Sequence, residues 1–143
     1  MKPVNLKYAK SQKGSINMSI KKSNLIYGEF GLVANEPGII NASQLAAAVL
    51  ALKRSLKKEG NTILRVFTHT PVTKKPSEVR MGKGKGSVSH YITKIQKGSF
   101  ILEIKIITKT SATSTLARNS LSLAKSKLPV STSIVCGVNP SSF

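Results

Sequence analysis

The sequence predicts an α+β fold in which two helices pack on one face of a mostly antiparallel sheet, with a basic N-terminal arm and a long Gly/Lys loop. Two segments carry apolar residues at helical spacings of 4, 3 and 4, and the segments around them are short and rich in β-branched residues. Their order is hairpin, helix, strand, hairpin, helix and strand, which is typical of helices segregated to one face of a sheet. A length of 143 residues suits a single domain of this kind.

The N-terminal segment differs in composition from the rest of the chain. Residues 1–22 lack hydrophobic periodicity and contain no acidic residue, so we expect an extended basic arm that becomes ordered on a partner. Residues 23–138 form the expected single domain, and residues 139–143 a short tail. The arm residues expected to bind the partner are Lys7, Lys10, Lys13, Lys21 and Lys22.

The domain is expected to begin with a hairpin and a helix. Residues 25–27 and 32–34 predict two short paired strands. The helix begins at Asn41, because Gln44 follows three residues later as in a capping box, and Gly60 is its expected end. The apolar stripe of this helix consists of Leu45, Val49, Leu52 and Leu56.

The middle of the chain predicts further strands. Residues 62–67 are rich in β-branched side chains, and residues 91–97 and 99–108 flank Gly98 as the arms of a hairpin would. The alternation in the last of these segments predicts one buried and one solvated face, with Glu103 on the solvated face. The residues expected on the buried face are Phe100, Leu102, Ile104 and Ile106.

A second helix and a final strand complete the predicted fold. Residues 114–128 repeat the 4, 3, 4 spacing, and Pro129 is expected to end the helix. Residues 130–138 then form the last strand. The apolar stripe of the second helix consists of Ala117, Leu121, Ala124 and Leu128.

The charge of the chain indicates a polyanionic partner. There are 23 Lys and Arg residues against 5 acidic residues, which gives a net charge of +18. Such self-repulsion is relieved by a partner with many negative charges, such as a nucleic acid. The five acids are all glutamates, so the chain has few carboxylates from which a catalytic pair or a metal site could be built. The sequence therefore predicts a binding protein that is not an enzyme and needs no cofactor.

Cysteine and histidine are too few for a metal site or a disulfide. Cys136 is the only cysteine, and only His69 and His90 accompany it. Cys136 lies in an apolar β-like run, so we expect a buried, inert thiol. The longest apolar run, residues 45–52, is far shorter than the roughly 20 residues of a membrane-spanning helix. We therefore expect no bound metal and no membrane.

The segment of residues 68–90 has no periodicity and is too long for an ordinary connection, which favours a functional loop. Its alternating glycines and lysines leave the backbone open to close approach by phosphate and place cations beside it. It matches neither the Walker A pattern nor the GxGxxG pattern, because residues required by each are missing. The expected ligand residues are Lys74, Lys75, Arg80, Met81, Gly82, Lys83, Gly84, Lys85, Gly86, Ser87 and His90.

The first helix has a basic face that is a weaker candidate for the same role. Lys53, Arg54 and Lys57 lie on its solvated side near its C-terminus. Cations at this end favour the helix dipole without any ligand, so solvation and ligand binding remain equal alternatives for these three residues.

Several motifs together resemble the L-sixteen family of large-subunit ribosomal proteins. The matching segments are Arg80-Met81-Gly82-Lys83-Gly84-Lys85-Gly86, the preceding residues 65–67 and 71–76, Phe30-Gly31-Leu32, Glu36-Pro37-Gly38, and residues 123–129. The resemblance implies an rRNA-binding structural protein near the aminoacyl site and the peptidyl transferase centre, whose loop helps to position aminoacyl-site tRNA. The implied partners are large-subunit rRNA, aminoacyl-site tRNA and neighbouring large-subunit proteins, without a homo-oligomer.

Two other functional classes remain as alternatives. The first is a free RNA-binding regulator or RNA chaperone, and a more distant one is an enzyme that uses the Gly/Lys loop on a phosphorylated substrate. For localisation, lysines outnumber arginines 19 to 4, although arginine grips phosphate better, which favours an AT-rich coding genome. The resemblance begins close to Met1, so no removable presequence is expected. We therefore expect a mitochondrial matrix ribosome, with a plastid or the bacterial cytoplasm as alternatives.

Overall fold

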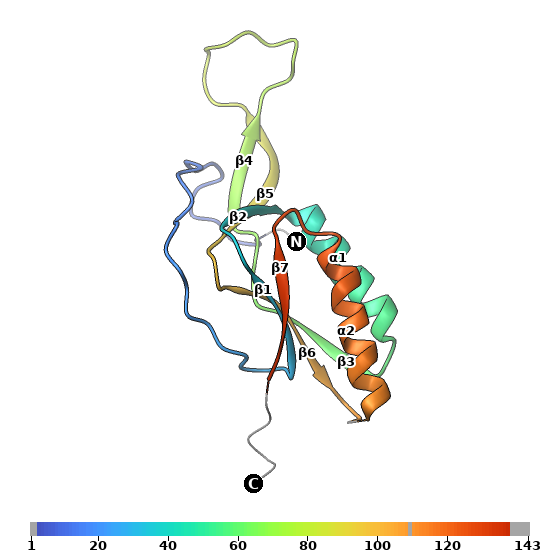
Figure 1. Cartoon of the computed structure of the whole chain (residues 1–143). Helices are drawn as coiled ribbons and strands as arrows, with labels where there is room; N and C mark the ends of the chain where they lie inside the picture. Colours follow the sequence, from blue (N-terminus) through green and yellow to red (C-terminus); the bar gives the residue numbers. More distant parts are fainter. Residues whose placement is uncertain (1–2, 109, 138–143) are drawn as a thin grey trace.

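The computed structural model describes residues 3–108 and 110–137, and its strands form two antiparallel sheets (Figure 1). The expected C-terminal tail, residues 139–143, lies outside the described residues. The four-stranded sheet has the order β3 (Gly60–Leu64), β6 (Phe100–Ile106), β1 (Phe30–Ala34) and β7 (Thr132–Cys136). The three-stranded sheet has the order β2 (Gly38–Asn41), β5 (Ser87–Ile95) and β4 (Thr70–Lys74). All strand pairs are antiparallel. The predicted α+β class is confirmed, although two sheets replace the single sheet we expected.

Two helices of 15 residues each, α1 (Ala42–Leu56) and α2 (Ser111–Lys125), pack side by side against the four-stranded sheet (Figure 1). Helix α2 contacts β1, β6 and β7, while α1 contacts β3 and also the smaller sheet through β2 and β5. Helix α1 thus joins the two sheets. Neither helix is long enough to span a bilayer, and no membrane-spanning candidate occurs among the described residues.

The helices start where side chains satisfy free backbone groups. At the start of α1 the Gln44 Oε1 accepts a hydrogen bond from the Asn41 N–H at 2.9 Å, as the capping-box spacing predicted. Helix α2 starts earlier than predicted, because Thr110 and Thr113 form an equivalent capping box. Helix α1 ends at Leu56, where Lys57 adopts a φ of 52°, and Gly60 begins β3 instead of ending the helix.

The hydrophobic core lies between the helices and the four-stranded sheet. Leu32 and Leu102 from the sheet, Leu52 from α1 and Leu121 from α2 are all fully buried. Of the predicted helical stripes, Leu45, Leu52, Leu56, Ala117, Leu121 and Ala124 are buried in this core. Val49 and Leu128 are half-buried against it, and Leu128 lies beyond the end of α2, which stops at Lys125 instead of the predicted residue 128. The other buried members of the cluster are Phe30, Ala34, Ile40, Leu45, Ala48, Leu56, Ile95, Ile101, Ile104, Ile106, Ala117, Ala124 and Val130.

Both predicted hairpins are wrong. Residues 25–27 form no strand, and β1 pairs with β6 and β7. Strands β5 and β6 are consecutive but lie in different sheets. The chain changes sheet at Gly98, whose φ is +82° and whose N–H donates to the Ala34 carbonyl at 2.7 Å. That bond directs the chain toward β1, away from a tight turn back onto β5.

The predicted solvated face of β6 is also wrong. Glu103 is fully buried, and Phe100 packs against Gly31, which is the register partner of Glu103. Register partners share one face of a sheet. Phe100 therefore lies on the face opposite to Leu102, because a bulge in the pairing of β1 with β6 shifts the alternation by one residue.

Candidate nucleic-acid interface

Strands β4 and β5 form a hairpin that projects from the body of the molecule and ends in an irregular tip, residues 75–86 (Figure 1). The predicted loop of residues 68–90 was too long, since Lys74 pairs with Ser87 and Thr73 with Val88. Strand β4 was not predicted because it contains Pro71, and proline is a poor strand residue except at the edge of a sheet. Strand β4 is an edge strand, so its proline is tolerated.

The tip carries three successive residues with positive φ. Gly82, Lys83 and Gly84 have φ values of 97°, 53° and 88°. A Cβ atom added at Gly82 or Gly84 would meet no atom within 4 Å, so contacts within the chain do not require these glycines. They are needed for the backbone conformation, and they leave it open on the outside.

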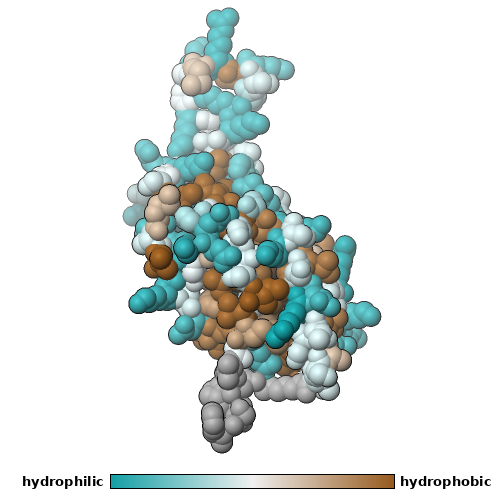
Figure 2. All heavy atoms as spheres, in the orientation of Figure 1, coloured by the Kyte–Doolittle hydropathy of each residue, from teal (hydrophilic) through white to brown (hydrophobic). Residues whose placement is uncertain are grey.

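The tip concentrates positive charge at the end of the hairpin. Residues 74–86 contain five cations and one acid, Glu78. The side chain of Lys75 is half-buried and donates to the Gly82 carbonyl, which ties the two sides of the tip together. The exposed cations are Lys74, Arg80, Lys83 and Lys85. Figure 2 shows this end of the molecule as predominantly hydrophilic.

The N-terminal arm lies against this hairpin. The Lys10 ammonium donates to the Lys85 carbonyl at 2.9 Å, and the Lys85 ammonium donates to the Ser11 carbonyl at 2.7 Å. Farther along, Lys94 on β5 donates to the Ser15 carbonyl at 3.0 Å. The arm and the tip therefore form one cationic surface, which the separate sequence segments did not reveal.

The remaining predicted residues are placed as follows. Met81 is 95% exposed at the tip, Ser87 begins β5, and His90 lies exposed on β5 beside Ser89. The exposed arm lysines are Lys7, Lys10, Lys13, Lys21 and Lys22. The basic face of α1, with Lys53, Arg54 and Lys57, is exposed at the end of the molecule away from the hairpin (Figure 1). The structure does not bring it together with the tip.

The structure also tests the predictions about metal ligands and about Cys136. Among the described residues, no cluster of three or more His, Cys, Asp or Glu side chains is placed to hold a metal ion. Cys136 is exposed, so the expected burial is wrong. It is the last residue of β7, at the edge of its sheet, where the apolar run no longer faces the core.

Sequence reasoning missed Lys94 as an interface residue. It stands among the alternating residues of β5 without any motif around it. Its partner, Ser15, is 79 residues away in the chain, so no local pattern could have indicated the contact. Gln96, which donates to the Ser19 hydroxyl at 3.4 Å, was missed for the same reason.

Comparison with known proteins identifies the family. The sequence profile of the family described as ribosomal protein L16p/L10e matches residues 3–135. The chain is 40% identical over 136 residues to the large ribosomal subunit protein uL16 of Borreliella burgdorferi (strain ATCC 35210 / DSM 4680 / CIP 102532 / B31), covering 94% of this chain and 95% of that relative. It is 43% identical to the protein of the same name from Cereibacter sphaeroides (strain KD131 / KCTC 12085), covering 94% and 96%. The chain therefore belongs to the ribosomal protein L16p/L10e family.

Proposed function

We propose that this chain is a non-enzymatic structural protein of the large ribosomal subunit that binds rRNA through its arm and hairpin tip and helps to position aminoacyl-site tRNA. Family membership and the names of the relatives support the ribosomal role. The finer part of the proposal, concerning rRNA and tRNA contacts, rests on the site itself.

The observation that carries the proposal is the joint cationic surface of arm and tip. The Lys10 ammonium donates to the Lys85 carbonyl and the Lys85 ammonium donates to the Ser11 carbonyl, so two basic segments that repel each other are held together in the free chain. The remaining repulsion between the two segments is relieved by a polyanion, and an RNA backbone supplies the required negative charge. The hairpin carries the tip away from the domain, which suits a contact with a second RNA beyond the one that holds the body (Figure 1).

Salt-dependent binding to large-subunit rRNA tests the proposal. Replacing Lys83 and Lys85 by Ala removes two cations from the tip and should reduce the slope of log K against log salt by about one to two units. The control replaces Lys58 and Lys105 by Ala, which removes two exposed cations at the other end of the molecule. An equal fall in slope for both double variants would contradict a specific role for the tip.

Co-sedimentation separates the proposal from a free RNA-binding regulator. A structural component remains with the large subunit through moderate salt, whereas a regulator is washed off. Subunits that lack the chain, then reconstituted with it, should also regain aminoacyl-site tRNA binding. Failure to regain it would remove the tRNA part of the proposal and leave the rRNA part intact.

The expected mitochondrial localisation is not supported by the comparisons. The relatives described above are bacterial, which favours the alternative of a bacterial cytoplasmic ribosome. The excess of lysine over arginine fits an AT-rich coding genome of either kind. Localisation in a mitochondrion stays a prediction, and mass spectrometry of purified ribosomes from the source cells and from their organelles decides it.

A further inference from the structure

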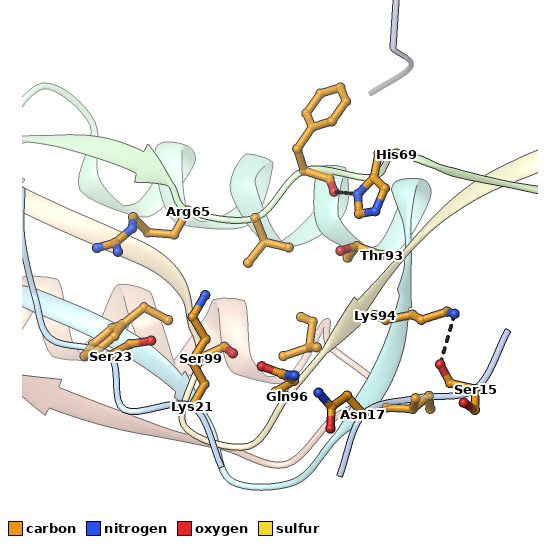
Figure 3. Close-up of a pocket in the computed structure, with 15 residues that line it drawn as sticks. Ser15, Asn17, Lys21, Ser23, Arg65, His69, Thr93, Lys94, Gln96 and Ser99 are labelled. Carbon is orange, nitrogen blue, oxygen red and sulfur yellow. Dashed lines mark hydrogen bonds between the residues drawn. The ribbon is translucent and has the colours of Figure 1, made fainter. Parts of the chain in front are cut away.

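A cavity of about 410 Å³ lies between the N-terminal arm, the segment that follows β3 and the end of β5 (Figure 3). It is separate from the hairpin tip. The arm forms one wall of it and is held there by three hydrogen bonds, from Lys94 to the Ser15 carbonyl, from Gln96 to the Ser19 hydroxyl and from the Lys21 N–H to the Lys97 carbonyl. The cavity is therefore present in the free chain. Its volume falls in the range of small-ligand sites.

The lining of this cavity combines apolar surface with hydrogen-bonding groups of both kinds. Val66 and Ile95 supply apolar surface. The Asn17 amide oxygen accepts from the Ser19 N–H, which leaves its NH2 group to donate, and Gln96 keeps its amide oxygen and one N–H beside its bond to the Ser19 hydroxyl. The hydroxyl of Thr93 can donate and accept. Figure 3 shows these three polar residues around the same space. Thr93 is only 2% exposed, so its position is fixed by the surrounding structure.

The charge of the lining selects an anionic ligand. None of the described residues that line the cavity is acidic. Arg65 is already paired with Glu103, and Lys94 donates to the arm, so both are engaged. Figure 3 shows the Lys21 side chain extending into the cavity, and among the described residues its ammonium has no hydrogen-bond or ion-pair partner. One free cation stands beside a set of amides and a hydroxyl.

From these observations we infer that the cavity receives one unstacked nucleotide of the bound RNA, with its base between the apolar side chains and the polar groups of Asn17, Thr93 and Gln96, and its phosphate at Lys21. Unstacked bases are the usual targets of sequence-specific RNA recognition, because their edges are then free to form hydrogen bonds. Anion sites usually bring several donors together, whereas this lining offers one free ammonium beside apolar side chains. The inference rests on the proposed rRNA-binding function and adds a base-specific contact to it.

Base-edge probing of the complex between the full chain and large-subunit rRNA tests the inference. Dimethyl sulfate and a carbodiimide reagent together report on all four bases. The wild-type chain should protect one unpaired base of the rRNA from these reagents. In complexes with Thr93→Val or Gln96→Leu, the reactivity of that base should rise about fivefold for each hydrogen bond that is lost. The rest of the footprint should not change.

Ser19→Ala is the matched control for Gln96→Leu. It removes the same contact between the arm and the residue after β5 but keeps the Gln96 amide, so it should retain the protection. The inference is overturned if every base has the same reactivity in the Thr93→Val and Gln96→Leu complexes as in the wild-type complex. It is also overturned if Ser19→Ala loses the protection as fully as Gln96→Leu, because arm docking would then explain the effect. If only Lys21→Gln changes the footprint, the cavity holds a phosphate and no base, which again overturns it.

Failure of the inference and failure of the proposed function are distinguishable. A wild-type chain that gives a footprint on the rRNA backbone without the base protection retains the proposed function and loses the nucleotide site. A wild-type chain that gives no footprint on large-subunit rRNA removes both. Thermal unfolding of each variant, with a midpoint near that of the wild type, shows that the fold is retained.

Discussion

Arg65 and Glu103 form an ion pair that joins the segment after β3 to the middle of β6. The Glu103 carboxylate is fully buried, and its other oxygen accepts hydrogen bonds from the N–H groups of Tyr27 and Gly28 at 2.8 and 3.0 Å. The Arg65 guanidinium lies 5.4 Å from the centre of the Tyr27 ring. One carboxylate thus holds together the sheet, the segment after β3 and the segment before β1.

Glu103→Gln is predicted to lower the free energy of unfolding by about 2 to 3 kcal/mol. The substitution leaves the Arg65 cation without its partner and removes the charge from the acceptor of two backbone hydrogen bonds. Urea unfolding at neutral pH measures the effect. Glu59→Gln removes an exposed carboxylate and should change stability by less than about 0.5 kcal/mol. Equal stability of the two variants would mean that the buried pair contributes nothing.

The sequence predicted the helices of this fold but not the position of Glu103. The helices were predictable because their periodicity and the Asn41–Gln44 capping box are local. Glu103 was assigned to solvent because alternation carries no information about a distant arginine. Its bonds to Tyr27 and Gly28 also occupy backbone donors that a predicted hairpin would have used.

In the candidate site, too, local features were predictable and long-range contacts were not. The tip was predictable, since Gly82 and Gly84 stand in a motif and adopt the positive φ that favours glycine. The docking of the arm was not, because Lys10 and Lys85 are 75 residues apart and contact each other's segments through backbone carbonyls, which every residue has.

Gly84→Val is predicted to impair the function of reconstituted large subunits more than Lys83→Ala does. Valine is strained at a φ of 88°, at a local cost of about 1 to 3 kcal/mol, and its branched side chain blocks close approach from outside. No atom lies within 4 Å of the added Cβ, so the domain should remain folded. Peptide-bond formation measures the effect. Ser77→Val adds the same side chain elsewhere in the tip, outside the positive-φ residues, and should be close to wild type. Wild-type activity of Gly84→Val subunits would refute the prediction.

Gly86→Ala is predicted to loosen the base of the tip for a different reason. The added Cβ would lie 2.8 Å from the Lys74 carbonyl oxygen, beside the terminal pair of Lys74 with Ser87. Backbone atoms must shift to relieve this contact, so amide hydrogen exchange at Ser87 and Val88 should accelerate about tenfold, the equivalent of 1.4 kcal/mol. Gly82→Ala imposes positive-φ strain without a steric contact, and exchange at the same two amides should stay near the wild-type rate. Equal acceleration in both variants would show that strain anywhere in the tip opens the hairpin.

Docking of the arm on the tip is predicted to strengthen as salt is added, in contrast to RNA binding. The contacts of Lys10 and Lys85 go to neutral carbonyls, which salt does not screen, whereas the repulsion between the two basic segments is screened. Backbone order parameters of residues 10–15 in the free chain should therefore rise between about 0.01 M and 0.3 M salt, as the Debye length falls from about 30 Å to well below 10 Å. Lys10→Ala and Lys85→Ala should lower these order parameters at every salt concentration. Lys13→Ala should raise them at low salt, because it removes a cation from the arm, and among the described residues its side chain makes no hydrogen bond. A fall in order with added salt would show that attraction between charges holds the arm in place.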